Sequence, residues 1–314
     1  MAVYTDVPAE DLEAFLTRYH LGPPLMAKGI AEGVSNSNYL VETREGRFIL
    51  TLYERRIDMQ ELPWFLRLMG HLADAGLPVP RPLADRNGEV VQQLKGRKAA
   101  LIEFLPGVSI SSPDPAHCRA IGTALARLHQ AAASFGPPRP NHLGIAAARS
   151  ACIALGDRLD ELEPGLQDCV RQSIERVEAG WPAALPRGVI HADLFPDNVL
   201  FTGHAVTGLI DFYFAASDLL AYDLAITRAA WTFSVDGRQH LAEHDAALVA
   251  GYEEVRPLAA AERRALPLLG EAACLRFLLT RAQDWFEAAG DALVARKDPL
   301  AFARRLAHFA GAAG

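Results

Sequence analysis

The sequence changes character once, near residue 105, and this change constrains the fold more than any other feature. The first third contains short segments rich in β-branched and aromatic residues, such as YLVET and FILTLY, with turn signals between them. Beyond residue 105, apolar residues recur mostly at helical spacing. A small antiparallel sheet followed by a mostly helical remainder predicts an α+β fold with two lobes, residues 1–105 and 106–314, and a ligand cleft between them.

Individual elements follow from the same patterns. The spacing of Leu12, Phe15, Leu16 and Tyr19 predicts an amphipathic first helix, with Asp6 as its cap and Pro8 early in its first turn. Three antiparallel strands are predicted at MAKGIAEG, YLVET and FILTLY, and a helix over residues 59–75. VPRPL, EVVQQL and AALIEFL are predicted to extend the sheet. The later helices are expected at RAIGTALARLHQAA, 151–180, 217–233 and from Glu262 onward.

Composition excludes several classes of protein. The 314 residues are 50% hydrophobic with a formal charge of −7, and no basic run exceeds Arg55-Arg56, so a nucleic-acid partner is not expected. The start lacks a signal-peptide pattern and no apolar stretch reaches roughly 18 residues, which predicts a cytoplasmic protein without a membrane partner. The four cysteines form no C-x-x-C pair, and nothing indicates an oligomeric state.

Residues 189–201 read VIHADLFPDNVLF, and polar groups interrupt this apolar pattern in a specific order. Asp193 and Asn198 are five apart in the loop after GVI, and Asp211 ends the apolar strand GLID. Mg²⁺ prefers hard oxygen ligands, so we predict that Asn198 and Asp211 bind it. The remaining carboxylate, Asp193, is then free to act as the base for an attacking hydroxyl. The spacing H-x-D-x-x-x-x-N followed by D-F is typical of phosphoryl-transfer enzymes.

Simpler interpretations exist for parts of this cluster. Pro196-Asp197-Asn198 alone would be a turn with Asx capping, but such a turn does not account for Asp193 and Asp211 at strand ends. We expect His191 to bond nearby backbone and Asp223, in AYDLA, to cap amides or brace the catalytic loop. His129 is expected to be a packing residue that faces the loop.

The segments HADLFPDNVLF, GLIDFYFA and AYDLA resemble the core of the aminoglycoside phosphotransferase family, a small-molecule branch of the protein-kinase-like fold. The resemblance extends through most of the chain. It implies a bilobal kinase fold, ATP and Mg²⁺ as cofactors, and direct transfer to a hydroxyl of a small-molecule substrate. The catalytic and metal loops would lie in residues 106–314 and nucleotide binding mainly in residues 1–105.

The same resemblance identifies nucleotide-binding candidates. GIAEGVSNSNYLVET resembles the loop that covers the phosphates, although GVSNSN alone is also an ordinary hairpin turn. IEFLPG resembles the hinge that binds adenine through backbone groups. Together with one residue of the third strand, the candidates are Gly33, Ser35, Asn36, Ser37, Asn38, Thr51, Glu103 and Leu105.

The third strand departs from the usual kinase pattern. FILTLYE places Thr51 where these kinases carry a Lys or Arg that neutralises phosphates. Either Arg55 or Arg56 substitutes, or the metal and the loop amides bind the phosphates without it. A non-catalytic nucleotide-binding module is the alternative that this departure favours. A metal-dependent hydrolase would need a denser set of His and carboxylate ligands.

FILTLYE, ELPWFLRLMGHLADAGLPVPRPL and LRFLLTRAQDWF resemble the homoserine kinase subgroup of this family, in which a similar Thr occurs. The resemblance implies L-homoserine as acceptor and a role in threonine biosynthesis. Arg281 and Asp284 share a helix face and offer opposite charges for such an amino acid, although an exposed ion pair explains them equally well. Ala282-Gln283 replaces a bulkier Leu-Tyr, so a choline-like or aminoglycoside acceptor stays open.

Overall fold

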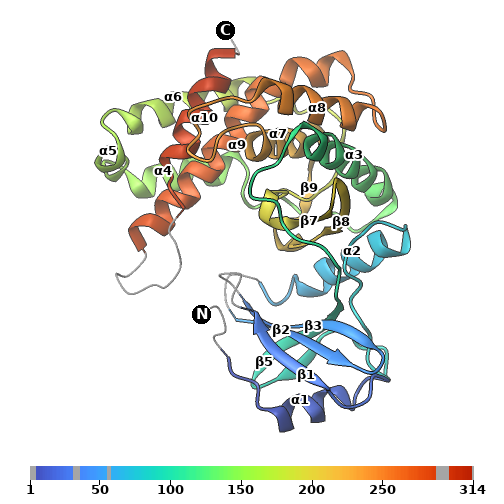
Figure 1. The fold of residues 1–314 in the computed structure, drawn as a ribbon. Helices are drawn as coiled ribbons and strands as arrows, with labels where there is room; N and C mark the ends of the chain where they lie inside the picture. Colours follow the sequence, from blue (N-terminus) through green and yellow to red (C-terminus); the bar gives the residue numbers. More distant parts are fainter. Residues whose placement is uncertain (1–4, 31–35, 55–57, 288–296, 313–314) are drawn as a thin grey trace. The chain divides into compact units, whose positions relative to one another are not determined.

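The computed structural model describes residues 5–30, 36–54, 58–287 and 297–312 (Figure 1). The chain divides into two compact units. The first unit comprises Met1–Gly107 and the short segment Thr207–Tyr213, and the second comprises Val108–Val206 and Phe214–Gly314. Asp211 therefore belongs to the first unit, whereas Asp193 and Asn198 belong to the second.

The first unit is built on a five-stranded antiparallel sheet with the order β1-β2-β3-β5-β4 (Figure 1). Its elements in chain order are α1 (Ala9–Leu16), β1 (Met26–Ile30), β2 (Asn36–Thr43), β3 (Gly46–Tyr53), α2 (Leu62–Asp74), β4 (Gln92–Leu94) and β5 (Arg97–Glu103).

One face of this sheet packs against α1. Leu12, Phe15 and Leu16 of the helix are buried with Val41 of β2 and Leu50 of β3 in a single apolar cluster. The period of three to four residues in the helix and of two in the strands brings these apolar side chains together. The amphipathic pattern of the sequence thus positions β2 and β3, which carry four of the eight nucleotide-binding candidates.

The second unit is mostly helical. Its elements in chain order are α3 (Pro115–Ala131), η1 (Ala132–Ser134), α4 (Ile145–Leu155), α5 (Arg158–Leu162), α6 (Leu166–Gly180), β6 (Arg187–Ile190), η2 (Pro196–Asn198), β7 (Val199–Thr202), β8 (Ala205–Leu209), η3 (Phe212–Phe214), β9 (Ala216–Leu219), α7 (Leu220–Trp231), α8 (Ala242–Glu253), α9 (Ala260–Glu287) and α10 (Leu300–Ala312). The divisions between the units fall within β8 and within η3, because Thr207–Tyr213 belongs to the first unit. Strand β6 pairs antiparallel with β9.

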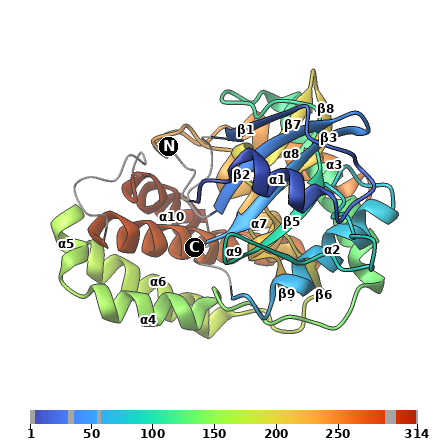
Figure 2. The same cartoon turned by 90° about the horizontal axis from the view of Figure 1, so that it is seen from below.

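The long helix α9 organises the packing of the second unit. It contacts α4, α6, α7 and α10, and Figure 2 shows α4 and α6 running alongside it. A second tight contact joins α3 to α8, where Gly122 faces backbone of α8 so closely that a Cβ would lie 2.0 Å from the Leu248 carbonyl oxygen. These contacts fix α3, α7 and α9, the helices that carry His129, Asp223 and Arg276.

The structure confirms the predicted antiparallel sheet and helical remainder, with three local corrections. VPRPL is not a strand and contributes only a bridge at Pro82, because its prolines lack the N–H groups that a ladder needs. The helix predicted over 151–180 is broken by Gly156 and Gly165, which have positive φ angles. Residues 216–219 form β9 before α7 begins.

The first helix also differs at its start. It begins at Ala9, and Pro8 occupies the N-cap position without a side-chain cap, so the predicted cap at Asp6 is wrong. Within the described residues, no helix is long and apolar enough to cross a membrane.

Candidate active site

Asp193 and Asn198, the two polar residues predicted from the VIHADLFPDN pattern, lie in contact within the loop that follows β6. The Nδ2 group of Asn198 donates to the Asp193 carbonyl oxygen at 2.8 Å and to its carboxylate at 3.1 Å. The Phe195 amide also donates to the Asp193 carbonyl, at 2.8 Å. The side chain of Asn198 therefore fixes the orientation of the Asp193 carboxylate.

The same bonds leave the amide oxygen of Asn198 available. Both of its assigned hydrogen bonds use Nδ2, and within the described part of the chain Oδ1 has no hydrogen-bond partner. A neutral oxygen next to a carboxylate is a donor set that suits a hard divalent cation. The residues at this position thus fit a magnesium ion.

Ala192 holds the loop in an unusual conformation. Its φ angle is +64°, a region that costs a residue with a side chain about 1–3 kcal/mol. Two buried charges bind its backbone: the Asp223 carboxylate accepts from its N–H at 2.8 Å, and Arg276 donates to its carbonyl oxygen at 2.6 Å. Opposite charges from α7 and α9 therefore clamp the residue that precedes Asp193.

Asp223 supports the loop at more than one point, as the sequence predicted. Its carboxylate is fully buried and also accepts from the His191 N–H at 2.7 Å, while the His129 ring lies 3.0 Å away. Burial would raise the pKa of Asp223, but the hydrogen bonds and charges of His129 and His191 outweigh it and lower the pKa. The group is therefore a stable anion beneath the loop.

The two histidines of this network have distinct partners. His191 accepts the Asp193 N–H on its Nδ1 atom at 3.2 Å, which agrees with the predicted backbone-bonding role. His129 lies between Asp223 and the Tyr252 hydroxyl, which is 2.8 Å from its Nδ1 atom. His129 was expected only to pack, but it links α8 to Asp223 by hydrogen bonds.

In the first unit, the nucleotide-binding candidates on β2 and β3 pair with each other. The Thr51 hydroxyl donates to the Asn38 side chain at 2.8 Å, directly across the two strands. Ser37 is buried and donates to Glu54 at 2.7 Å. Asn36 is also buried, and among the described residues its side-chain oxygen has no partner. The remaining loop candidates, and both arginines proposed to replace the strand lysine, lie outside the described residues: Gly33, Ser35, Arg55 and Arg56.

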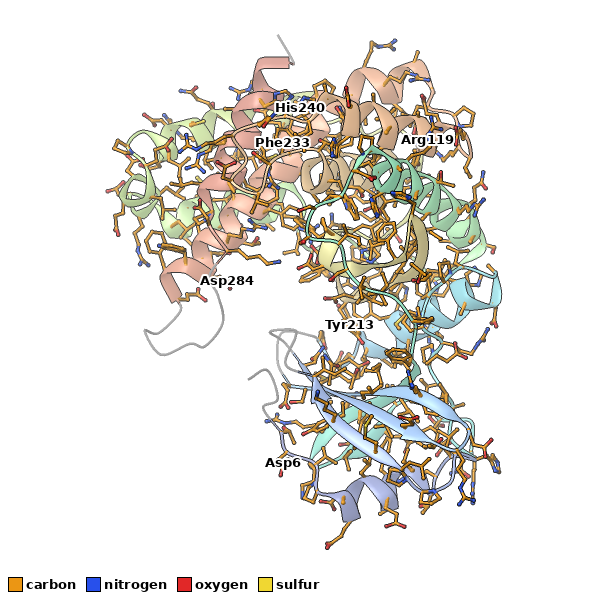
Figure 3. The ribbon with its side chains drawn as sticks, in the orientation of Figure 1. Asp6, Arg119, Tyr213, Phe233, His240 and Asp284 are labelled. Atoms are coloured by element: carbon orange, nitrogen blue, oxygen red, sulfur yellow. The ribbon has the colours of Figure 1, made fainter. Side chains whose placement is uncertain are left out.

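Asp211 lies beside this part of the sheet. Its φ angle is +63°, and its negative charge contributes to the raised pKa values of Tyr53 and Tyr213, after the larger effect of burial. The hydroxyls of these two tyrosines are 2.8 Å apart (Tyr213 is labelled in Figure 3). Tyr53 follows Thr51 by two residues on β3, so both point to one face of the sheet. Asp211 is thus near the face that carries Thr51.

Lys98 is a cation on the same face that the sequence interpretation missed. Thr51 pairs with Ala100 and Tyr53 with Lys98, and residues that pair directly across antiparallel strands point to the same side. The Lys98 ammonium group donates to the Met59 carbonyl at 2.8 Å. Only the register of β3 against β5 reveals this neighbour, because 47 positions separate Lys98 from Thr51 in the sequence.

The predicted adenine hinge has one available amide. The Glu103 N–H donates to the Arg81 carbonyl, and the Phe104 N–H donates to the Arg47 carbonyl. The N–H of Leu105, by contrast, makes no hydrogen bond to any residue that the structure describes. Its backbone could therefore bind a base nitrogen.

Arg281 and Asp284 have different surroundings on α9. The Arg281 guanidinium lies 4.5 Å from the Phe302 ring centre. Burial and the positive charge of Arg305 lower its pKa to about 10, although the negative charges of Asp197 and Asp193 oppose this shift. Asp284 is exposed near the end of the helix (Figure 3). Arg281 is thus a partly buried cation within electrostatic range of Asp193.

Arg276 is the residue that the sequence interpretation should have found. It is 4% exposed and lies in the run AACLRFLL, where it interrupts an otherwise apolar helical segment. A lone arginine in such a run needs a buried partner, since an unpaired buried charge is very costly. That pattern predicts that Arg276 has a buried partner, but it does not identify this partner as the Ala192 carbonyl oxygen.

Comparison with known proteins agrees with this geometry. The model of the phosphotransferase enzyme family matches residues 27–258. The chain belongs to this family. A homoserine kinase of Gluconobacter oxydans is 54% identical over 314 residues, and the match covers 99% of each chain. A homoserine kinase of Xanthobacter autotrophicus is 49% identical over 306 residues, with 98% of this chain and 95% of that protein covered.

Solved structures share the fold at much lower identity. A spectinomycin phosphotransferase in complex with ADP and spectinomycin superposes with a TM-score of 0.71 at 14% identity, covering 98% of this chain and 99% of that one. An amicoumacin kinase in complex with AMP-PNP and Ca²⁺ gives 0.68 at 17% identity, covering 95% and 90%. The predicted kinase-like fold is confirmed. The family and the relatives at about half identity also confirm the prediction of a small-molecule kinase.

Proposed function

We propose that this protein transfers the γ-phosphoryl group of ATP to the hydroxyl of L-homoserine and forms O-phospho-L-homoserine, a step of threonine biosynthesis. The observation that carries the proposal is that about half of the residues, over nearly the full length, are identical to proteins named homoserine kinase. The chain also has Asp193, Asn198 and Asp211 at the spacing that is typical of phosphoryl-transfer enzymes.

Asp193 would be the general base. Its carboxylate is held by Asn198, and the strained Ala192 conformation before it is fixed by Asp223 and Arg276. A base held in this way can orient the acceptor hydroxyl and accept its proton as the phosphoryl group is transferred. Positioned general bases contribute about 10²–10⁴-fold to a rate.

Asn198 Oδ1 and the Asp211 carboxylate would hold Mg²⁺, which neutralises the charge of the nucleotide phosphates when it is bound. The nucleotide would contact residues 33–38 and Thr51 through its phosphates, and Glu103 to Leu105 through its base. Lys98 is our candidate for the cation that Thr51 cannot supply, because it lies on the same sheet face. These assignments are proposals supported by positions within each unit.

The acceptor would be recognised by opposite charges. Burial and the positive charge of Arg305 lower the pKa of Arg281, so a bound carboxylate would stabilise its guanidinium. Asp284, one turn later on α9, would receive the ammonium group. A polycationic aminoglycoside would find the Arg281 guanidinium repulsive, which favours an amino acid as acceptor.

The test is ATP consumption with L-homoserine, L-serine, choline, methylthioribose and kanamycin, with the product identified by mass. We expect homoserine to be the best acceptor by a clear margin. A different preferred acceptor would refute the substrate and leave the kinase intact. Nucleotide binding without transfer to any acceptor would favour a non-catalytic module.

A matched variant tests the base. Asp193→Asn keeps the shape of the side chain and its contact with Asn198, so ATP binding should be nearly unchanged while turnover falls by about 100-fold or more. Turnover within a few-fold of the parent would remove Asp193 from the role of base.

A further inference from the structure

A second group of ligand-type side chains lies apart from the catalytic loop. Asp114 is the N-cap of α3, His117 is in the first turn of that helix, and His204 is in the turn between β7 and β8. The donor atoms of these three residues all lie within 4.8 Å of one another. Arg119, labelled in Figure 3, marks the same end of α3.

The helix cap fixes two of these side chains. Asp114 Oδ1 accepts the His117 N–H at 2.9 Å, and the His117 ring returns to the Asp114 N–H, with 3.4 Å between Nδ1 and N. In this capping box the lone pair of Nδ1 faces the backbone of residue 114. The ring is only 12% exposed and packs against Phe201, with 4.9 Å between ring centres.

The cap also places the His117 ring next to the Asp114 carboxylate. Its Nδ1 atom is also 2.8 Å from Asp114 Oδ1. If Nδ1 accepts the Asp114 N–H, it presents a lone pair to a carboxylate oxygen at a distance at which two acceptors repel each other. The tautomer with its proton on Nδ1 removes this repulsion by donating to the carboxylate, and a metal ion between the two atoms would take the place of that proton.

His204 supplies a third donor from a distant part of the sequence. Its Nε2 atom is 3.0 Å from the other oxygen of Asp114, and its ring centre is 4.5 Å from that of His117. The bridge between Val108 and Phe201 brings the hairpin to this position. Two imidazole nitrogens and one carboxylate thus converge from two elements that are held independently.

We propose that Asp114, His117 and His204 form a binding site for a divalent transition-metal ion of the zinc class. The ligands would be His117 Nδ1, His204 Nε2 and a carboxylate oxygen of Asp114, with water in the fourth position. Two imidazoles and one carboxylate suit Zn²⁺, Co²⁺ or Ni²⁺, whereas Mg²⁺ and Ca²⁺ prefer oxygen ligands alone. The site therefore selects a different ion from the one that accompanies ATP.

The cluster is accessible to an ion from solvent. The side chain of Asp114 is 50% exposed and that of His204 is 59% exposed, so an ion can enter without local unfolding. The bound ion would tie the start of α3 to the hairpin that follows Asn198.

The experiment is isothermal titration of untagged, chelator-treated protein with Zn²⁺ at neutral pH in millimolar Mg²⁺. His204→Gln keeps a polar side chain next to Asp114, and Asp114→Asn keeps a good N-cap, so both variants should fold. His20→Gln, at an exposed histidine of the other unit, is the matched control. We expect one Zn²⁺ site in the parent and in the control.

Loss of a ligand should weaken Zn²⁺ binding by at least about 100-fold, since even changes to the outer partners of a ligand cost about 10–100-fold. Co²⁺ should give the intense visible bands of a four- or five-coordinate site in the parent and lose them in His204→Gln. Equal Zn²⁺ affinity in the parent and in His204→Gln, or Co²⁺ spectra typical of six-coordinate aqueous ion, would overturn the proposal.

Discussion

Asp223→Asn is the substitution that tests the support of the catalytic loop most directly. The carboxylate uses one oxygen for the Ala192 N–H and the other for the His191 N–H and His129. An asparagine of the same shape has only one oxygen. Whichever way its amide is turned, an NH₂ group faces one of the two backbone N–H groups.

The expected losses of stability and of kcat follow from these contacts. A buried N–H that loses its acceptor costs about 1–3 kcal/mol, and the surviving bonds lose the charge of the acceptor, which adds about 1 kcal/mol. The free energy of unfolding should fall by about 2–4 kcal/mol. Because Ala192 is strained, a weaker clamp lets the loop relax, and each 1.4 kcal/mol lost in positioning Asp193 lowers kcat about tenfold. We expect kcat to fall about 10–100-fold.

The assay compares Asp223→Asn with Asp245→Asn. Asp245, a carboxylate of α8 whose side chain is 14% exposed, accepts two bonds of 2.6 and 2.7 Å from Arg228 and has no hydrogen bond to the described residues 191–198. Both variants should lose stability to urea, but only Asp223→Asn should lose kcat, with the KM for ATP nearly unchanged. A kcat within about twofold of the parent, or an equal loss of kcat in both variants, would refute the role of Asp223 in positioning.

The pH dependence of stability gives a second readout. The pKa of Asp223 is lower in the folded protein than in the unfolded chain, so its stabilising effect is present above about pH 4, the unfolded value. It is lost as the pH falls through the folded pKa. The stability difference between the parent and Asp223→Asn should therefore shrink below about pH 4. A difference that stays constant down to pH 2 would contradict an ionised Asp223.

Three further substitutions, one of them with a matched control, test other parts of the molecule. Asp211→Ala should abolish Mg²⁺-dependent turnover without unfolding the protein, and turnover retained at ordinary Mg²⁺ would exclude Asp211 as a ligand. Arg281→Gln should raise the KM for homoserine about 10-fold or more and leave the KM for ATP unchanged, and an unchanged KM for homoserine would exclude contact with its carboxylate. Gly122→Ala should lower the free energy of unfolding, measured in urea, by at least about 1–3 kcal/mol, because the added Cβ would overlap a carbonyl oxygen of α8. Gly70→Ala, in a helix with open space, should stabilise it by about 0.5–1 kcal/mol; equal effects would show that α3 and α8 can separate.

The sequence predicts the type of most elements because hydrophobic periodicity decides it locally. The sheet strands and the helical remainder follow from periods of two and of three to four residues, and the contact between Asp193 and Asn198 follows from their position in one short loop. The prediction of elements fails where the backbone chemistry of a residue such as proline overrides the hydrophobic pattern. VPRPL has the apolar alternation of a strand, but proline removes the donors that pairing requires.

The sequence does not show which residues that lie far apart in the chain meet in the fold. Lys98 shares a sheet face with Thr51 only through the register of β3 against β5, and His204 meets Asp114 only because a hairpin lies beside the start of α3. No local propensity encodes either pairing. Tertiary packing decides both, so a structure is needed to find them.

The two charges on the Ala192 peptide explain why the loop can hold a strained residue. Burying Asp223 or Arg276 alone would be very unfavourable, since each side chain is almost fully removed from water. Each charge instead bonds a fixed backbone group, the carboxylate to the N–H and the guanidinium to the carbonyl oxygen. Because α7 and α9 pack against each other, neither charge can follow a moving loop. The positive φ of Ala192 lets its N–H and its carbonyl oxygen bond to both charges at once, and these bonds fix the backbone that precedes Asp193.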